Sequence, residues 1–353
     1  MIIEKLLHSQ GAWLAGDAGH GAVISTRVRL ARNLADTPFP GWAQEPVRQA
    51  VWDRVHPVVA ALDGMQDAFL LAMNALDEVD KRVLCERHLI SLELAERADG
   101  CGVVARRDET VSVMINEEDH LRLQTIRPGN ALPAAWRELD ALDSELGRQL
   151  PYAFSARLGY LTACPSNVGT GLRASAMLHL PGLTLMNEME PIVRGLGKIG
   201  LTVRGVAGEG TEACGNLFQV SNQMTLGERE QGIVKRLDRI VTEIEDHESN
   251  ARARLLEKRE RIVYDYVGRA YGVLRHAEVL SSKEALYLLS GLRLGLELGV
   301  VDKLDLMVLN QLMLLMQPGH LQRVAGKRLA PEERDELRAE TVRRRLRGAA
   351  LLR

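Results

Sequence analysis

The segment 116–124, NEEDHLRLQ, places three consecutive carboxylates, a histidine and an arginine directly after the apolar run TVSVMI. A solvated turn would account for these charges. A catalytic acidic cluster formed by Glu117, Glu118 and Asp119, beside a phosphate-binding arginine at Arg122, would account for them too. Four further stretches of the chain bear on this choice.

Two of these stretches contain arginines in positions that suit phosphate. In STRVR, Arg27 and Arg29 lie at period two, so they project from one side of a strand, about 7 Å apart. Two guanidinium forks on one face suit a polyphosphate, although a solvated strand face is the common alternative. CPSNVGTGLRAS is a glycine-rich turn that leads to Arg173; it lacks the GK[ST] of a P-loop, and a plain turn is its alternative. Cys164 in this stretch is either a small buried hydrophobe or a thiolate near a cationic substrate.

The other two stretches are RGVAGEG and ERHL. In RGVAGEG, Arg204 and Glu209 flank a flexible loop, which could equally be an ordinary hairpin turn. ERHL contributes His88, and a lone histidine on a helix is more often packed or on the surface than a ligand. Taken together, the stretches contain six arginines, five of them outside ERHL, and at least two glutamates but no lysine. Such a set favours a cage of guanidinium groups around the phosphates of a nucleotide.

The composition excludes several other classes of protein. The 353 residues include 45 Lys and Arg against 47 Asp and Glu, so the chain is not a polycation, and only 4% of residues are aromatic, which leaves few platforms for nucleic-acid bases. The four cysteines lack CxxC spacing, which argues against a zinc site or a disulfide framework. The sequence shows no secretory signal and no apolar stretch of membrane-spanning length. We therefore expect a cytoplasmic protein with reduced thiols.

The patterns of apolar residues predict an α+β body over residues 1–255 and a helical domain over residues 256–353. The body contains a strand within residues 21–34, helices within 45–98, a hairpin over 102–115, a helix from Pro133, and then short strands between glycine-bearing loops. From Thr225 onward the chain is predicted to be helical. The predicted helix starts are Thr225 with Glu228 as a capping box, Ser281 with Glu284, Asp302, and Pro331.

The stretches STRVRLARNL, NEEDHLRLQ, CPSNVGTGLRASAMLHLP and RGVAGEGTEACGNLFQVSNQ resemble the ATP:guanidino phosphotransferases, or phosphagen kinases, and occur in the same order. The resemblance implies a catalytic domain like that of glutamine synthetase, with a curved, mostly antiparallel sheet flanked by helices. It implies ATP, carried with Mg²⁺, as co-substrate, and no metal ligands from the protein itself.

The resemblance also implies a role for individual residues. Glu118 and Glu209 would contact the guanidinium of the acceptor, with Cys164 beside it, and His88 would lie near the adenosine. The implied ATP-binding residues are Ser25, Thr26, Arg27, Val28, Arg29, His88, Arg122, Arg173, Ala174, Ser175, Ala176, Met177, Arg204, Gly205, Val206, Ala207, Gly208 and Glu209.

Two features separate this chain from the kinases of small guanidino compounds. Only 24 residues precede STRVR, where those enzymes have a leading helical domain, so we expect a more open site. In addition, RDELRA at 334–339 is similar to the RDxxRA motif of the bacterial protein arginine kinases. This likeness implies a regulatory phosphoarginine pocket containing Arg334, Asp335, Arg338 and Ala339, whereas an ordinary solvated helix is the alternative for the hexamer alone.

The likeness to the protein arginine kinases implies a wider role. Such an enzyme phosphorylates exposed arginines of misfolded proteins and of a heat-shock repressor, which marks them for a Clp protease, and a zinc-binding activator protein assists it. The helical domain, with its apolar stretch LMVLNQLMLLM, would form a homodimer. No membrane or direct nucleic-acid partner is expected. A kinase of free arginine and a non-catalytic adaptor for basic or phosphorylated proteins stay open as alternatives.

Overall fold

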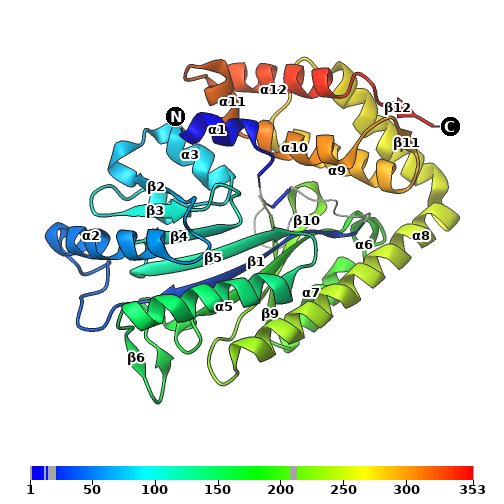
Figure 1. Cartoon of the computed structure of the whole chain (residues 1–353). Coiled ribbons are helices and arrows are strands. Elements are labelled where there is room, and N and C mark those ends of the chain that lie inside the picture. The colour runs from blue at the N-terminus through cyan, green and yellow to red at the C-terminus, as the bar shows by residue number, and fades with distance from the viewer. Residues whose placement is uncertain (1, 12, 15–20, 207–212, 353) are drawn as a thin grey trace. The chain divides into compact units, whose positions relative to one another are not determined.

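The computed structural model describes residues 2–11, 13–14, 21–206 and 213–352 (Figure 1). The chain forms two compact units. Unit 1 consists of Met1–Gly16, Ser25–Ala176 and Ser221–Ile240, and unit 2 of Asp17–Ile24, Met177–Val220 and Val241–Arg353. The predicted boundary at residue 255 falls inside one long helix and stays a prediction.

Eight strands form one sheet in the order β2-β3-β4-β5-β1-β8-β10-β9. Their bounds are β1 Val23–Arg32, β2 Phe69–Ala72, β3 Gly102–Ala105, β4 Val111–Ile115, β5 Leu121–Pro128, β8 Leu172–His179, β9 Leu201–Gly205 and β10 Leu217–Asn222. Neighbours from β2 to β1 pair antiparallel. Two-residue strands form two further pairs, β6 Phe154–Ser155 with β7 Gly159–Tyr160 and β11 Val301–Asp302 with β12 Ala350–Leu351.

Helices of unit 1 cover both faces of its part of the sheet. Helix α2, Glu45–Ala61, contacts β3 and β4, and α5, Leu132–Gln149, contacts β5 and α2, so these two share a face (Figure 1). On the other face, α1 Ile2–His8, α3 Glu78–Glu86 and α4 Leu92–Ala95 enclose an apolar cluster that includes Val103 and Met114. Successive strand residues point to opposite faces, which is why β3 and β4 are buried throughout.

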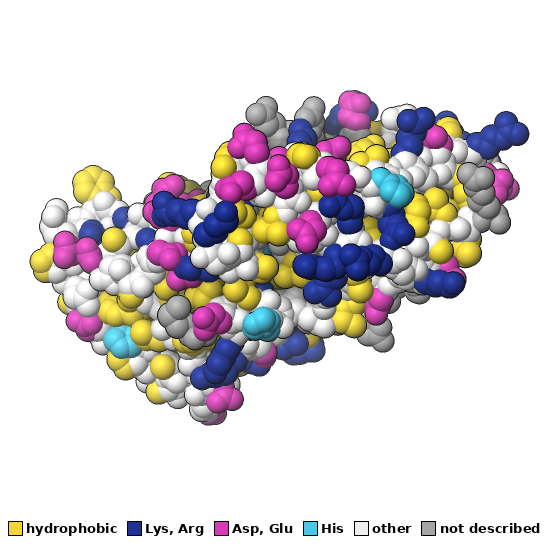
Figure 2. Space-filling view, turned by 90° about the horizontal axis from the view of Figure 1, so that it is seen from above, with side chains coloured by type: hydrophobic (Ala, Val, Ile, Leu, Met, Phe, Trp, Pro, Cys, Tyr) yellow, Lys and Arg dark blue, Asp and Glu magenta, His cyan; other side chains and the backbone are white. Residues whose placement is uncertain are grey.

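Unit 2 is mainly helical. Its helices are α6 Pro181–Leu185, α7 Met189–Lys198, most of α8 Glu230–His276, α9 Ser282–Glu297, α10 Leu306–Leu315, α11 Pro318–Ala325 and α12 Pro331–Arg345. The backbone of α8 leaves helical geometry at Arg259. Figure 2 shows acidic and basic side chains gathered near one another on the face seen from above.

The strand predicted within 21–34, which the structure places at Val23–Arg32, the hairpin at 102–115 and the helix from Pro133 are confirmed, as are the cap at Ser281 and the helix from Pro331. The run of helices predicted within 45–98 is interrupted by β2. The other errors concern caps. Thr225 caps no helix because α8 begins at Glu230, and the N-cap of α10 is Asp305, whose side chain accepts from the amide of Met307, while Asp302 lies in β11.

Candidate active site

The register of β1, β5 and β4 brings three sequence-predicted arginines to one face of the sheet. Ala31 lies opposite Arg122, and Arg29 lies opposite Gln124. Directly opposed residues of antiparallel strands project to the same side, and period-two spacing adds Arg27. Arg122 also faces Met114 of β4, which belongs to the cluster under α3 and α4. The face that carries the arginines is therefore the α3 and α4 face.

The acidic segment follows β4, which ends at Ile115, and the next residue, Asn116, turns the chain with a φ of 58°. The next carboxylate, Glu117, is buried and accepts hydrogen bonds from the Arg122 guanidinium and the Ser91 hydroxyl. Burial alone would raise the pKa of Glu117, but Arg122 and Ser91 together hold it below its ordinary value. Glu117 is thus ionised and fixed on Arg122.

Glu118 differs from its neighbours because it is exposed and lines a cavity. Its backbone amide donates to the Glu117 carboxylate at 3.3 Å, which turns its own side chain toward the open space. Burial of part of the group, followed by repulsion from Asp119 and Glu117, raises the pKa of Glu118 above its ordinary value. A carboxylate in this position can accept a proton more readily than an ordinary glutamate.

Asp119 connects this segment to the loop of Cys164. Its Oδ1 atom accepts from the Asn33 side chain at 2.6 Å and from the Ala163 amide at 2.6 Å. The Cys164 thiol lies 3.0 Å from the Ser166 hydroxyl, and the Thr162 hydroxyl donates to the Cys164 carbonyl at 2.7 Å. Asp119 therefore supports the loop that places Cys164 beside Glu118.

The predicted phosphate-binding arginines form a crowded cluster of like charge. Burial, and then Arg122 and Arg173, lower the pKa of Arg27 to about 10, and the pKa of Arg29 falls well below its ordinary value for the same reasons. Among the described residues, no hydrogen-bond partner reaches the buried Nε of Arg29. Arg173 donates to the Ser221 hydroxyl at 3.3 Å. An anion bound here would relieve the repulsion within the cluster.

His88 lies at the edge of the same cluster. Its ring packs edge-on against Trp13, with 4.8 Å between centroids. Burial, and then Arg27 and Arg29, lower the pKa of His88 to about 3, so its imidazole is neutral near pH 7. A neutral ring beside the arginines suits contact with an uncharged part of a nucleotide better than contact with phosphate.

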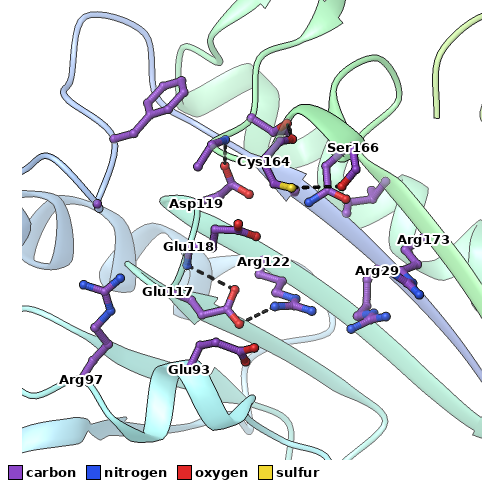
Figure 3. Close-up of a pocket in the computed structure, with 18 of the residues that line it drawn as sticks. Arg29, Glu93, Arg97, Glu117, Glu118, Asp119, Arg122, Cys164, Ser166 and Arg173 are labelled. Atoms are coloured by element: carbon purple, nitrogen blue, oxygen red, sulfur yellow. Dashed lines mark hydrogen bonds and ion pairs between the residues drawn. The ribbon is translucent and has the colours of Figure 1, made fainter. Parts of the chain in front are cut away.

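A cavity of about 520 Å³ joins the acidic segment, the loop of Cys164 and three of the arginines, Arg29, Arg122 and Arg173, whereas Arg27 and His88 are not part of its lining. Figure 3 shows Arg29 and Arg173 on one side of Glu117 and Glu118, and Arg97 on the other. The lining also includes residues that the sequence did not single out, namely Phe39, Gly41, Trp42, Glu93, Arg97, Thr162 and Asn167. The sequence signals of the first five are a Pro- and Gly-containing loop, PFPGW, and a charged pair four residues apart, whereas Thr162 and Asn167 lie near and within the stretch that begins at Cys164.

Several predicted site residues lie elsewhere or cannot be placed. Within β1, Thr26 and Val28 alternate with the arginines and are buried on the other face; the Thr26 hydroxyl accepts from the Ala131 amide. The predicted residues of β8 split in the same way. Ala174 and Ala176 are buried on the far side, the Ser175 hydroxyl donates to the Arg27 carbonyl at 3.4 Å, and Met177 is half-buried in unit 2.

The predicted loop residues belong to unit 2. Arg204 is exposed at the end of β9, where Gly205 and Val206 follow it. The Val206 amide donates to the Leu217 carbonyl, which closes the neck of the loop. Ala207, Gly208 and the proposed second carboxylate, Glu209, lie outside the described residues.

The segment 334–339 is on α12, and its residues are mostly engaged within unit 2. Arg338 is 1% exposed and donates to the carbonyls of Met316 at 2.9 Å and Leu280 at 2.6 Å, and to the Asp335 carboxylate. Ala339 is buried. Arg334 is half-buried, so it is the more accessible guanidinium of the two.

No group of three or more His, Cys, Asp or Glu side chains is arranged to hold a metal ion within 2–11, 13–14, 21–206 and 213–352. Over the same part of the chain, the structure contains no helix that is long and apolar enough to cross a membrane.

Two protein families match the chain in succession. The ATP:guanido phosphotransferase C-terminal catalytic domain matches residues 50–251, and the protein-arginine kinase McsB C-terminal domain matches residues 260–351. The protein-arginine kinase of Halothermothrix orenii is 46% identical over 98% of both chains. That of Moorella thermoacetica is 46% identical over 97% of this chain and 99% of its own.

Solved structures of guanidino kinases share the fold. The duplicated taurocyamine kinase of Schistosoma mansoni, with bound transition state analog components, has a TM-score of 0.59 and 28% identity, covering 70% of this chain and 36% of that chain. A lombricine kinase has a TM-score of 0.58 and 26% identity, covering 69% of this chain and 71% of its own. The α+β fold predicted from the sequence, with its largely antiparallel sheet and helical C-terminal part, is confirmed.

Proposed function

The chain belongs to the ATP:guanido phosphotransferase family, in which it is an ATP-dependent protein-arginine phosphotransferase, and we propose that the cavity containing Glu118 and Arg122 is where it transfers phosphate. The acceptor is an arginine side chain of a protein. The observation that carries the proposal is the position of Glu118, an exposed carboxylate in the same cavity as the arginine cluster.

The arginines of the cavity bind the phosphates of ATP, which enters as its Mg²⁺ complex. Arg29, Arg122 and Arg173 all line the cavity, and the first of these has a buried Nε without a partner among the described residues. Guanidinium forks make paired hydrogen bonds to phosphate oxygens and do not lose their charge. Phosphoryl transfer is mainly positioning and neutralisation of charge, so a rigid cage of this kind meets its needs. Arg27, on the same face of β1 as Arg29, would bind the nucleotide with them.

Glu118 acts on the acceptor. A guanidinium has a pKa above about 12 and is a poor nucleophile while it is protonated. Glu118 would hold its plane and align one nitrogen with the γ-phosphorus. The nitrogen lone pair then forms the N–P bond, the bond from phosphorus to the bridging oxygen breaks, and ADP leaves with that electron pair. The proton from nitrogen passes to a carboxylate, for which the raised pKa of Glu118 is suited. Cys164 contacts the acceptor beside Glu118.

The test combines a product analysis with a variant. A basic protein is incubated with the enzyme and ATP, handled without acid, and analysed by mass spectrometry for phosphoarginine. We expect Glu118→Gln to fold normally and to lose about 10²- to 10⁴-fold in turnover, which is the usual contribution of a positioned base. Glu138→Gln, which alters a surface carboxylate paired with Arg106 and Arg127, is the matched control and should keep its activity.

The same experiment separates this function from its alternatives. Because the pKa of Glu118 is raised, activity should fall as the pH drops toward that value, at a higher pH than for an ordinary glutamate. Unchanged turnover in Glu118→Gln would show that Glu118 is not the carboxylate that acts on the acceptor. Phosphate only on serine or threonine would overturn the reaction itself, and phosphorylation of free arginine in place of the protein would favour a small-molecule kinase.

We propose that the product serves as a mark for degradation. Phosphoarginine on misfolded proteins and on a heat-shock repressor would direct them to a Clp protease in the cytoplasm, with a zinc-binding protein as activator of the kinase. The similarity of 334–339 to the RDxxRA motif supports this role. Arg334 would make the first contact with phosphoarginine. Arg338 would have to exchange its present bonds to Met316 and Leu280 for the ligand, with Asp335 and Ala339 completing the pocket.

We also propose that the enzyme works as a homodimer through its helical part. The apolar stretch of α10 contributes less to this surface than its sequence indicates, since Leu309, Leu312 and Leu314 are buried within unit 2. Exposed apolar side chains such as Tyr287 and Met307 remain for contact with a second copy.

A further inference from the structure

Part of the cavity lining is left over after the nucleotide and the acceptor guanidinium are assigned. It consists of Phe39, Gly41 and Trp42 from the loop between β1 and α2, together with Glu93 and Arg97. The side chain of Trp42 is 88% exposed, whereas Trp13, Trp52 and Trp136 are all below 10%. A large aromatic side chain usually contributes by being buried, so an indole left in water at the mouth of a cavity is notable.

The loop presents this indole from an ordered backbone. The amides of Trp42 and Ala43 both donate to the Phe39 carbonyl at 2.9 Å, and the Arg48 guanidinium donates to the Ala43 carbonyl at 2.6 Å. His120 holds the beginning of the loop, since its Nε2 lies 3.1 Å from the Pro38 carbonyl. The Phe39 ring also packs edge-on against His120, with 6.1 Å between centroids.

These contacts place Trp42 with respect to the catalytic carboxylate. His120 follows Glu118 by two residues, so the acidic segment and the loop form one bonded structure. The backbone that carries Trp42 is therefore held by the same segment that carries Glu118.

The in-line geometry of phosphoryl transfer indicates which part of the acceptor reaches these lining residues. In phosphoryl transfer, the attacking nitrogen and the departing oxygen lie roughly in line on opposite sides of phosphorus. If Arg29 and Arg173 hold the nucleotide, the rest of the acceptor extends from Glu118 away from them. Figure 3 shows Arg97 on this far side. A cavity of about 520 Å³ accepts an arginine side chain but not a protein, so the adjoining polypeptide has to rest on the rim.

We propose that Trp42 is the docking platform for the polypeptide that flanks the acceptor arginine, and that it determines the preference for proteins over free guanidino compounds. The inference rests on the proposed function. The indole packs against the aliphatic stem and main chain of the acceptor, and its N–H can donate to a peptide carbonyl. Tryptophan is among the residues that most often dominate binding when a partner covers them.

Glu93 supplies the charge that complements this platform. It is exposed, lines the same cavity as Trp42, and is close enough to Arg122 and Glu118 to raise the pKa of both. Its carboxylate favours a cationic acceptor, and a neighbouring basic residue, at the rim.

The first test is kinetic. An arginine-rich basic protein that contains no tryptophan is used as acceptor for the full-length wild-type enzyme and for Trp42→Ala, Trp42→Phe and Phe154→Ala. Phe154 is a matched control because it is 60% exposed and does not line the cavity. We expect Trp42→Ala to raise the KM for the acceptor about 10-fold or more, as for an interface residue of the dominant kind, with kcat and the KM for ATP unchanged. Trp42→Phe should restore most of the affinity, and Phe154→Ala should match the wild type.

The second test follows the indole itself. Because the other three tryptophans are buried, addition of the same acceptor without nucleotide should shift the emission of the wild-type protein to shorter wavelength. This shift should be absent in Trp42→Phe. An acceptor KM in Trp42→Ala equal to that of the wild type, a fall in kcat alone, or a shift that persists in Trp42→Phe would each overturn the inference.

The two proposals fail in different ways. If the wild-type enzyme forms phosphoarginine on the acceptor but Trp42→Ala behaves identically, only the role of Trp42 is wrong. If the wild-type enzyme forms no phosphoarginine on any protein, the proposed function is wrong and the docking platform falls with it.

Discussion

The environment of His120 requires a neutral imidazole, which makes this residue a source of acid sensitivity. Its Nδ1 atom accepts from the Leu34 amide at 3.1 Å, so that atom cannot carry a proton. The proton is therefore on Nε2, which donates to the Pro38 carbonyl at 3.1 Å. Burial lowers the pKa of His120 to about 4, against a smaller opposite effect of the Pro38 carbonyl.

The consequence for stability follows from the difference between the folded and unfolded pKa values. An unfolded histidine titrates near pH 6.5, so below this pH the unfolded chain binds a proton that folded His120 does not. The contribution of neutral His120 to the free energy of unfolding is fully present above about pH 6.5 and is lost as the pH falls toward 4. Between pH 7 and pH 5, a shift of this size removes about 2 kcal/mol from the free energy of unfolding.

The variant His120→Asn isolates this effect. The asparagine oxygen can still accept from the Leu34 amide, but the side chain does not titrate. We expect urea unfolding to show a lower stability than the wild type at pH 7, because the bond to Pro38 is lost, and a pH dependence smaller by about 2 kcal/mol between pH 7 and 5. The other histidines are unchanged and cancel in the comparison. His276→Asn, at an exposed site, should keep the wild-type pH dependence. Parallel pH curves for wild type and His120→Asn would refute the reasoning.

Two further predictions concern stability. Arg87 and Glu109 form a buried pair, with the guanidinium Nε 2.7 Å and one Nη 2.6 Å from the carboxylate oxygens. Arg87→Met should therefore lower the free energy of unfolding in urea by about 3–5 kcal/mol, because it leaves a buried carboxylate unpaired. Arg269→Met, which removes an exposed ion pair, should have no measurable effect. Gly215 has a φ of +64°, and a Cβ there would lie 2.7 Å from the Leu286 carbonyl oxygen. Gly215→Ala should therefore lower the free energy of unfolding by more than the roughly 1–2 kcal/mol that a left-handed alanine costs by itself. Gly227→Ala, with a φ of +88° and open space around it, measures the left-handed cost alone, and equal thermal shifts in the two variants would contradict the close packing at Gly215.

Local sequence patterns were sufficient to predict which side chains share a face when those side chains belong to one strand. Arg27 and Arg29 share a face because alternation is a property of any strand. The alignment of Arg122 with Ala31, in contrast, depends on pairing between segments about ninety residues apart, which no local pattern encodes. The short strand β2 was missed for a related reason. Its four residues, FLLA, also fit a helix, and its pairing with β3 decides between the two.

Capping residues were ambiguous because the same side chain can satisfy different backbone groups. The hydroxyl of Thr225 caps no helix and donates instead to the carbonyls of Ser166 and Val168, which fastens the loop after Cys164. A threonine followed by a glutamate three residues later fits either arrangement. Trp42 and Glu93 could not be assigned from sequence either, because they join the cavity only through the packing of a loop and a short helix.

The three consecutive carboxylates of 117–119 acquire different roles from the backbone that carries them. After the left-handed Asn116, successive side chains point in different directions: Glu117 toward Ser91 and Arg122, Glu118 into the cavity, and Asp119 toward the Ala163 amide. The first carboxylate already neutralises Arg122, and the third is engaged by amide donors, so Glu118 alone is available to a cationic ligand. Its raised pKa is partly a result of this division, because its two fixed neighbours repel the charged form. The outer acids therefore do more than support the reactive one, since they make it a stronger base.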